Sequence, residues 1–195
     1  MDHSSELAQG KAIAEAIKRS PGQWKVVVYS TMIGPRGKTG VAHNDAKVDV
    51  LGLLRATGSP VVELRPAVFM DNLTIPGFGP KEGKLPGLLK PGCKAQWIAT
   101  KDIGEFAAII FDDPSRWVGK KESLAIAGDE LTMPEVAQVI AKVRGSAKPW
   151  VYKQVRARDL APWREGWGRG GRQLLNLPSF PLLLQPPPRS SPASS

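Results

Sequence analysis

The sequence predicts an α/β fold in which a mostly parallel sheet is flanked by helices. Residues 4–155 alternate between helix and strand signals, the order that crossover connections give to parallel sheets. Two runs, 24–30 and 61–65, are short, apolar and rich in β-branched residues, as strands buried on both faces are. The helical segments carry apolar residues at helical spacing. We therefore expect 26–29 and 61–64 to be central strands of the sheet.

In the first half of this body the strand signals alternate with clear helix signals. Ile13 and Ile17 lie four residues apart in the first helix, and Pro21 stops that helix. Leu51 and Leu54 mark the apolar face of the second helix. The expected elements are, in order, a helix over 6–19, a strand over 24–30, a glycine-rich loop over 33–40, a helix over 44–57 and a strand over 61–65.

The second half begins with a long loop that is crowded with Gly and Pro. Asp102, with Glu105 three residues on, predicts a cap for the helix that follows. Thr132 and Glu135 form a capping box with Pro in the first turn of the last helix, and 128–130 is expected to be a turn before it. The expected elements are a loop over 74–93, a strand over 95–99, a helix over 103–111, a strand over 122–127, a helix after Thr132 and a strand over 150–155.

Composition excludes several classes of function. The formal net charge is +9, but Lys and acidic residues are interspersed through residues 1–154, and no clustered basic stripe predicts specific nucleic-acid binding. No apolar run approaches the roughly 20 residues that a membrane span needs, and the N-terminus does not resemble a secretory signal. We therefore expect no membrane partner and a cytoplasmic location, with the nucleus as a second. One Cys and two His exclude a disulfide framework and a histidine-rich metal centre.

The chain divides into a domain over 1–160 and a low-complexity tail over 161–195. Residues 178–195 contain six Pro and five Ser and lack the periodic apolar positions that a core needs, so we predict that the tail is disordered. Two other interpretations stay open for the tail. Its Gly-Arg stretch over 165–172 fits an RNA contact, and Pro178 with Pro181 fits a Pro-rich ligand.

His43 and Lys47 are the pair of residues that could carry chemistry. No P-loop, no Gly-x-Ser-x-Gly elbow and no Gly-x-Gly-x-x-Gly turn occurs in the sequence. His43 and Lys47 lie four residues apart at the start of a helix, so both can face the same side. A Lys beside the carboxyl end of a parallel strand is placed to bind a ribose or to lower a neighbouring pKa. The alternative is a solvated Lys and a surface His near a helix start.

Several segments, in their order and spacing over residues 5–155, resemble the NmrA-like family of atypical short-chain dehydrogenase/reductases. The segments are Gln9-Gly10-Lys11, Val26-Val-Val-Tyr-Ser30-Thr31, His43-Asn-Asp-Ala-Lys47, Leu64-Arg-Pro-Ala-Val-Phe-Met-Asp-Asn72-Leu73, Asp102-Ile-Gly104 and Leu124-Ala-Ile-Ala-Gly-Asp-Glu-Leu-Thr132. The resemblance implies a Rossmann-like fold that binds NADP or NAD.

The resemblance also implies the roles of particular residues. Lys47 would contact the nicotinamide ribose, and His43 stands where related dehydrogenases carry the Tyr that donates a proton. These two are the candidate catalytic residues. Those expected to bind the cofactor are Lys47, Phe69, Met70, Asp71, Asn72, and Ser30 and Thr31 at a strand end. A His with an ordinary pKa near 6.5 is a different acid from a phenol.

Two functions follow from the resemblance. The first is an NAD(P)-dependent reductase. The second is a non-enzymatic, redox-sensing regulator that binds cofactor and a transcription factor or other protein. The glycine-rich turn that holds the pyrophosphate in this family is missing from the sequence, so we expect a partial, truncated Rossmann-like domain with impaired nucleotide binding.

Overall fold

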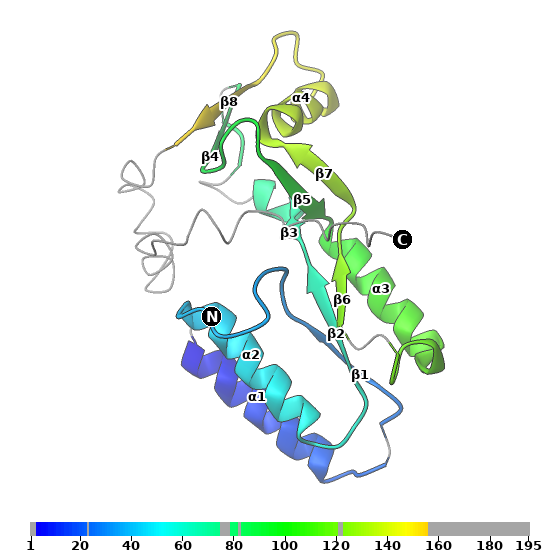
Figure 1. The fold of residues 1–195 in the computed structure, drawn as a ribbon. Helices are drawn as coiled ribbons and strands as arrows, with labels where there is room; N and C mark the ends of the chain where they lie inside the picture. The colour runs from blue at the N-terminus through cyan, green and yellow to red at the C-terminus, as the bar shows by residue number, and fades with distance from the viewer. Residues whose placement is uncertain (1–2, 23, 75–78, 82, 121–122, 156–195) are drawn as a thin grey trace, which may run out of the picture.

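The computed structural model describes residues 3–22, 24–74, 79–81, 83–120 and 123–155. The predicted tail over 161–195 lies outside the described residues. Four α-helices, two short 3-10 helices and eight strands occur in the described part (Figure 1). In chain order they are α1 (His3–Lys18), β1 (Val27–Ser30), α2 (Ala42–Arg55), β2 (Val61–Pro66), β3 (Val68–Phe69), η1 (Met70–Thr74), β4 (Lys84–Gly87), β5 (Lys94–Ile98), α3 (Thr100–Asp112), η2 (Pro114–Arg116), β6 (Ser123–Ile126), β7 (Asp129–Thr132), α4 (Met133–Val143) and β8 (Val151–Gln154).

The sheet that carries the predicted central strands is parallel, with the strand order β1-β2-β6. Val27 pairs with Val61, and Glu63 pairs with Ser123. The α/β class and the parallel pairing of β1 with β2 are therefore confirmed. The central position of β1 is wrong, because β1 is an edge strand among the described residues and β2 alone has a neighbour on each side.

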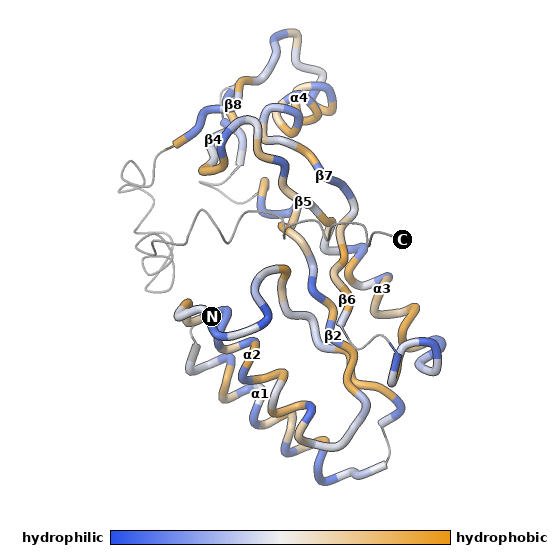
Figure 2. Tube along the Cα trace, in the orientation of Figure 1, coloured by the Kyte–Doolittle hydropathy of each residue, from blue (hydrophilic) through white to orange (hydrophobic). Residues whose placement is uncertain are grey.

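Helices cover both faces of this sheet (Figure 1). The helices α1 and α2 pack against each other on one face, and α3 covers the other. Alternation along β2 explains the two layers, since successive side chains of a strand point to opposite faces. Val62 and Leu64 are fully buried in one core cluster with Ile110 of α3, whereas Val61 packs with Leu54 of α2. Figure 2 shows the matching alternation of hydrophilic and hydrophobic residues along the three helices.

The alternation of β2 also places charged groups on the face of α2. Glu63 and Arg65 follow Val61 at a spacing of two, so they share its face. Neither is fully buried. The sheet therefore presents an apolar patch under α2 and, further along the same strand, a polar surface. This polar surface is the floor of the candidate site described below.

Two smaller sheets lie beyond the parallel sheet. The strands β3, β5 and β7 form one of them, in which β5 and β7 are antiparallel. The strands β4 and β8 form the other and are parallel. A third core cluster, which includes Leu85, Trp97 and Val136, packs beneath α4. The predicted loop over 74–93 is thus wrong in part, because β4 lies within it.

The structure confirms one of the two predicted helix caps and contradicts the other. The capping box of α4 is confirmed: the Thr132 side chain accepts from the Glu135 N–H, and the Glu135 carboxylate accepts from the Thr132 N–H. The cap at Asp102 is wrong, because α3 begins earlier, with Ala99 as its N-cap residue, and Asp102 lies in the first turn. The turn over 128–130 is also wrong in part, since Asp129 begins β7, which pairs with β5.

Replacing the cap residue of α4 should reduce stability. In Thr132→Ala the Glu135 N–H loses its acceptor, and we expect the free energy of unfolding to fall by about 1 kcal/mol. Chemical denaturation followed by circular dichroism measures the change. Thr74→Ala is a matched control, because the Thr74 hydroxyl donates to the Asp71 carbonyl in an exposed position. An equal loss in both variants would contradict a specific role for the cap.

Candidate functional site

A cavity of about 320 Å³ lies between α2 and the polar part of the parallel sheet. Its floor includes Glu63 and Arg65 of β2 and Ser123 of β6. One wall is the loop that follows β1, and the other is the inner face of α2. The lining residues are Thr31, Met32, Ile33, Gly34, Pro35, Arg36, Asn44, Lys47, Val48, Leu51, Gly52, Arg55, Glu63, Arg65 and Ser123. The volume is at the lower end of the range of small-molecule sites.

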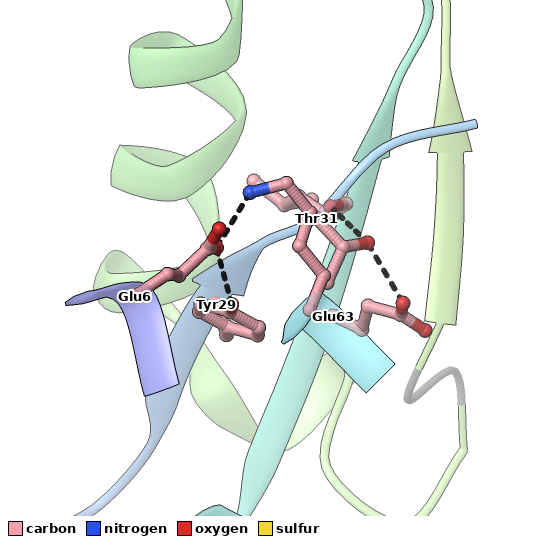
Figure 3. A network of polar contacts seen from close by, with 6 residues as sticks. Glu6, Tyr29, Thr31 and Glu63 are labelled. Carbon is pink, nitrogen blue, oxygen red and sulfur yellow. Dashed lines mark hydrogen bonds and ion pairs between the residues drawn. The ribbon is translucent and has the colours of Figure 1, made fainter. Parts of the chain in front are cut away.

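Lys47 is held at the edge of this cavity by a carboxylate from α1. The Nζ of Lys47 donates to Oε1 of Glu6 at 2.8 Å, and the two side chains are only 25% and 17% exposed. The Tyr29 hydroxyl donates to the same oxygen at 3.3 Å (Figure 3). Burial and the neighbouring Glu6 carboxylate raise the pKa of Tyr29, so it stays protonated. The ion pair therefore fixes the ammonium group of Lys47 near the end of β1.

A second set of polar contacts joins the strands of the sheet. The Thr31 hydroxyl donates to Oε1 of Glu63 at 2.7 Å, and the Ser123 hydroxyl donates to Oε2 at 2.7 Å. Thr31 is buried at the end of β1, and Figure 3 shows it pointing toward Glu63. Each carboxylate oxygen of Glu63 thus accepts a hydrogen bond from a hydroxyl group. These bonds satisfy a charged group that would otherwise be costly to keep half-buried.

His43 lies one turn before Lys47 on α2 and is half-buried. Burial, and next the positive charge of Lys47, lower the pKa of His43 from its ordinary value. The imidazole is therefore neutral at pH 7. A neutral imidazole can donate one N–H hydrogen bond and accept another, but it is not the phenol that related dehydrogenases use.

The pKa of His43 can be measured without interference. The sequence has two histidines, so His3→Gln leaves a single imidazole signal. By NMR titration we expect a pKa below 6.5, and Lys47→Met should raise it because the like charge is gone. Lys18→Met is the control, since Lys18 pairs with Glu15 on the exposed side of α1.

The lowered pKa of His43 has a consequence for stability. Below pH 6.5 the unfolded chain binds more protons at this residue than the folded chain does, so the free energy of unfolding falls as the pH drops through this range. An unperturbed His43 titration would contradict both expectations.

The other predicted site residues lie in β1, β3 and η1. Ser30 is the exposed last residue of β1, and Phe69 ends β3, where it packs against the core of the parallel sheet. Met70, Asp71 and Asn72 lie in η1. The Asp71 carboxylate accepts from the Thr100 N–H at the start of α3, at 2.9 Å, and this bond lowers the pKa of Asp71.

The cavity brings together only part of the predicted set. Of the predicted residues, Thr31 and Lys47 line it. His43, Ser30 and the segment 69–72 are not among its lining residues. The expected approach of Lys47 to 69–72 around a ligand stays a prediction.

Sequence reasoning missed several polar residues around Lys47. Glu6 binds Lys47, and Glu63 accepts from Thr31. Tyr29 and Ser123 donate in turn to these two carboxylates. One signal could have found Glu63: it stands with Arg65 at a spacing of two in an otherwise apolar strand, which indicates one polar face. No comparable local signal links Glu6 to Lys47, because these residues meet only through packing of α1 on α2.

The described part of the chain contains neither a metal-binding cluster nor a membrane-spanning helix. No group of three or more His, Cys, Asp or Glu residues there could hold a metal ion. None of the helices there combines the length and the apolar character that crossing a membrane requires.

Known structures share this fold. The NmrA structure in complex with NAD, a negative transcriptional regulator, superposes with a TM-score of 0.63 at 22% identity, and the match covers 80% of this chain and 51% of that one. Leucoanthocyanidin reductase from Vitis vinifera, in a binary complex with NADPH, gives 0.64 at 20% identity, with coverage of 94% and 58%. A nucleoside-diphosphate-sugar epimerase from Staphylococcus aureus gives 0.63 at 17% identity, with coverage of 96% and 70%.

The sequence match defines the family. This chain spans about half the length of the NmrA structures that it matches. No match was found among curated proteins. The model of the NmrA-like family matches residues 2–162, which is most of the chain and includes every residue that lines the cavity. The partial Rossmann-like α/β fold and the sequence match agree, and the chain belongs to the NmrA-like family.

Proposed function

We propose that this chain binds a nicotinamide dinucleotide, NAD or NADP, and serves as the nicotinamide-facing part of an NAD(P)-dependent reductase. The observation that carries the proposal is the position of Lys47: a half-buried ammonium group beside the end of β1, fixed by Glu6 and close to the buried Thr31. In open α/β sheets ligands bind at the carboxyl ends of the strands. The NAD and NADPH complexes of structures with this fold support the choice of ligand.

We propose that the residues expected from the resemblance hold one half of such a cofactor. Lys47 would donate to ribose hydroxyls, and Ser30 and Thr31 would lie beside the nicotinamide, with Phe69, Met70, Asp71 and Asn72 on its other side. The bound cofactor would supply hydride transfer. Glu6 holds the side chain of Lys47 in place through their ion pair.

The pyrophosphate has no glycine-rich cradle in this sequence. Each charge-assisted hydrogen bond of such a cradle contributes about 1.5–3 kcal/mol. We therefore propose that the 195-residue chain binds the dinucleotide weakly, by contacts to its nicotinamide half. Micromolar NADPH affinity of the purified chain would contradict this part of the proposal.

The test of the proposal is a titration of the chain with NADPH and NADH, followed by NMR so that weak binding is detected. Lys47→Met should raise the dissociation constant about tenfold or more, because it removes a charged donor. Lys18→Met removes a Lys that also pairs with a Glu, but on the exposed side of α1, and should leave the dissociation constant unchanged. Equal affinities of the Lys47→Met variant and the unmodified chain would overturn the assignment of Lys47.

The second candidate is a non-enzymatic, redox-sensing regulator that binds a transcription factor or other protein partner. The observation in its favour is His43, whose lowered pKa leaves a neutral imidazole where the dehydrogenases carry a proton-donating Tyr. Calorimetry with the dinucleotides, followed by an oxidation assay over a panel of carbonyl compounds, separates the two functions. Binding without turnover favours the regulator, and turnover favours the reductase.

A further inference from the structure

Three arginines from three different elements border the cavity. Arg36 lies in the loop after β1, Arg55 is the last residue of α2, and Arg65 lies in β2. Arg36 and Arg55 also border a wider, open hollow of about 820 Å³, together with Lys120. Two of the three arginines therefore border both the cavity and the hollow. The proposed dinucleotide site makes no use of these arginines.

The charges that line the cavity do not cancel. Lys47 is paired with Glu6, and Glu63 is the carboxylate among the lining residues. Both oxygens of Glu63 already accept hydrogen bonds, from Thr31 and Ser123. None of the ion pairs between described residues involves the three arginines. Three arginines against one glutamate leave a surplus of two positive charges among the lining residues.

The arginines differ in how firmly their side chains are held. The Arg65 side chain donates to the Gly34 carbonyl, which orients its guanidinium group and leaves its other N–H donors available. Arg36 and Arg55 are exposed, so their side chains can adjust to a ligand. A guanidinium group offers a planar fork of donors that matches the oxygens of a phosphate.

Asn44 adds a buried polar group with an unmet hydrogen bond. It lies on the inner face of α2, borders the cavity and is 9% exposed. Its Oδ1 atom has no partner among the described residues. A buried acceptor without a donor reduces stability, and a turn of the Asn44 side chain toward the cavity would let a ligand hydroxyl supply the donor. This atom distinguishes the cavity from a merely basic surface.

We propose that the cavity binds a phosphomonoester that also carries a hydroxyl group. A phosphomonoester has a charge of about −1.5 to −2 at pH 7, which matches the surplus of two positive charges. The source is a small phosphorylated metabolite, because the phosphomonoester of NADP belongs to the adenosine half of the cofactor, which the proposed function leaves without contacts. The proposal is independent of the role of Lys47, because the arginines and not the lysine select the ligand.

The experiment is an NMR titration of the 195-residue chain with glycerol 3-phosphate, observed at the arginine side-chain N–H signals. We expect saturable shifts of the Arg36, Arg55 and Arg65 signals. The double variant Arg36→Gln/Arg55→Gln should raise the dissociation constant about tenfold or more. The control is Arg19→Gln/Arg116→Gln, which also removes two charges, at exposed positions outside the cavity lining. Circular dichroism checks that each variant is folded.

The outcomes separate the two sources of phosphate and can overturn the site. If NADP displaces glycerol 3-phosphate and NAD does not, the site takes the phosphate of the cofactor, and the assignment to a separate metabolite is overturned. If neither displaces it, the site takes a separate phosphorylated molecule. The absence of saturable binding, or an equal loss of affinity in the control variant, overturns the proposal. Failure of the Lys47→Met test in the NADPH titration affects the proposed function alone, since glycerol 3-phosphate binding is measured without a dinucleotide.

Discussion

Ile110→Ala should lower the free energy of unfolding by about 2–5 kcal/mol, the range found for removing a large aliphatic side chain from a core. Ile110 is fully buried between α3 and the parallel sheet, in the cluster that holds Val62 and Leu64 of β2. The loss should shift the thermal midpoint by on the order of 10 °C.

The matched control for this substitution is the neighbouring residue. Ile109 has the same side chain on the same helix but is 48% exposed, so Ile109→Ala should cost less than about 1 kcal/mol. Thermal and denaturant unfolding of both variants measure the difference. Similar losses at the two positions would mean that α3 does not cover the sheet as described.

Gly10→Ala should destabilise the chain by about 1–3 kcal/mol, although alanine is the better helix former. A Cβ atom at Gly10 would lie 2.4 Å from Cγ2 and 2.8 Å from Cγ1 of Val50, which is stiff and buried in α2. The two helices would have to separate. Glu6 lies one turn before Gly10 on α1, so the same movement would stretch its ion pair with Lys47.

A double-mutant cycle tests this steric explanation. In the Val50→Ala background the added methyl group has room, and the penalty of Gly10→Ala should largely disappear. Gly104→Ala is the control in α3, where no atom lies within 4 Å of the added Cβ; it should raise stability by up to about 1 kcal/mol. Additive effects of the substitutions at Gly10 and Val50 would rule out the contact as the cause.

The elements that the sequence predicted well are those with strong local signals. The capping box at Thr132 and the β-branched run at Val61 act within a few residues, and the structure confirms both. The strands that were missed lack such signals. β4 contains Pro86 and lies in a segment rich in breakers, and it forms only because β8 pairs with it. Likewise β7 is short and charged, and its partner β5 determines its conformation.

The candidate site shows the same division between local and distant information. The spacing of His43 and Lys47 on one helix is a local property and could be predicted from sequence. That Glu6 binds Lys47, or that Ser123 binds Glu63, depends on which elements become neighbours in the fold. The arginine cluster around the cavity also comes from three separate segments, and no periodicity in the sequence relates them.

The parallel pairing of β4 with β8 has a consequence for how the chain folds. Lys84 meets Val151, so the whole of β5, α3, β6, β7 and α4 must be looped out before this pair can form. Closing so long a segment costs chain entropy. The contacts of the four paired residues offset this cost only after the two strands have met. The pairing of β1 with β2 spans a shorter segment that α2 already organises. We therefore expect β8 to join last, and its amides to exchange with solvent sooner than those of β2.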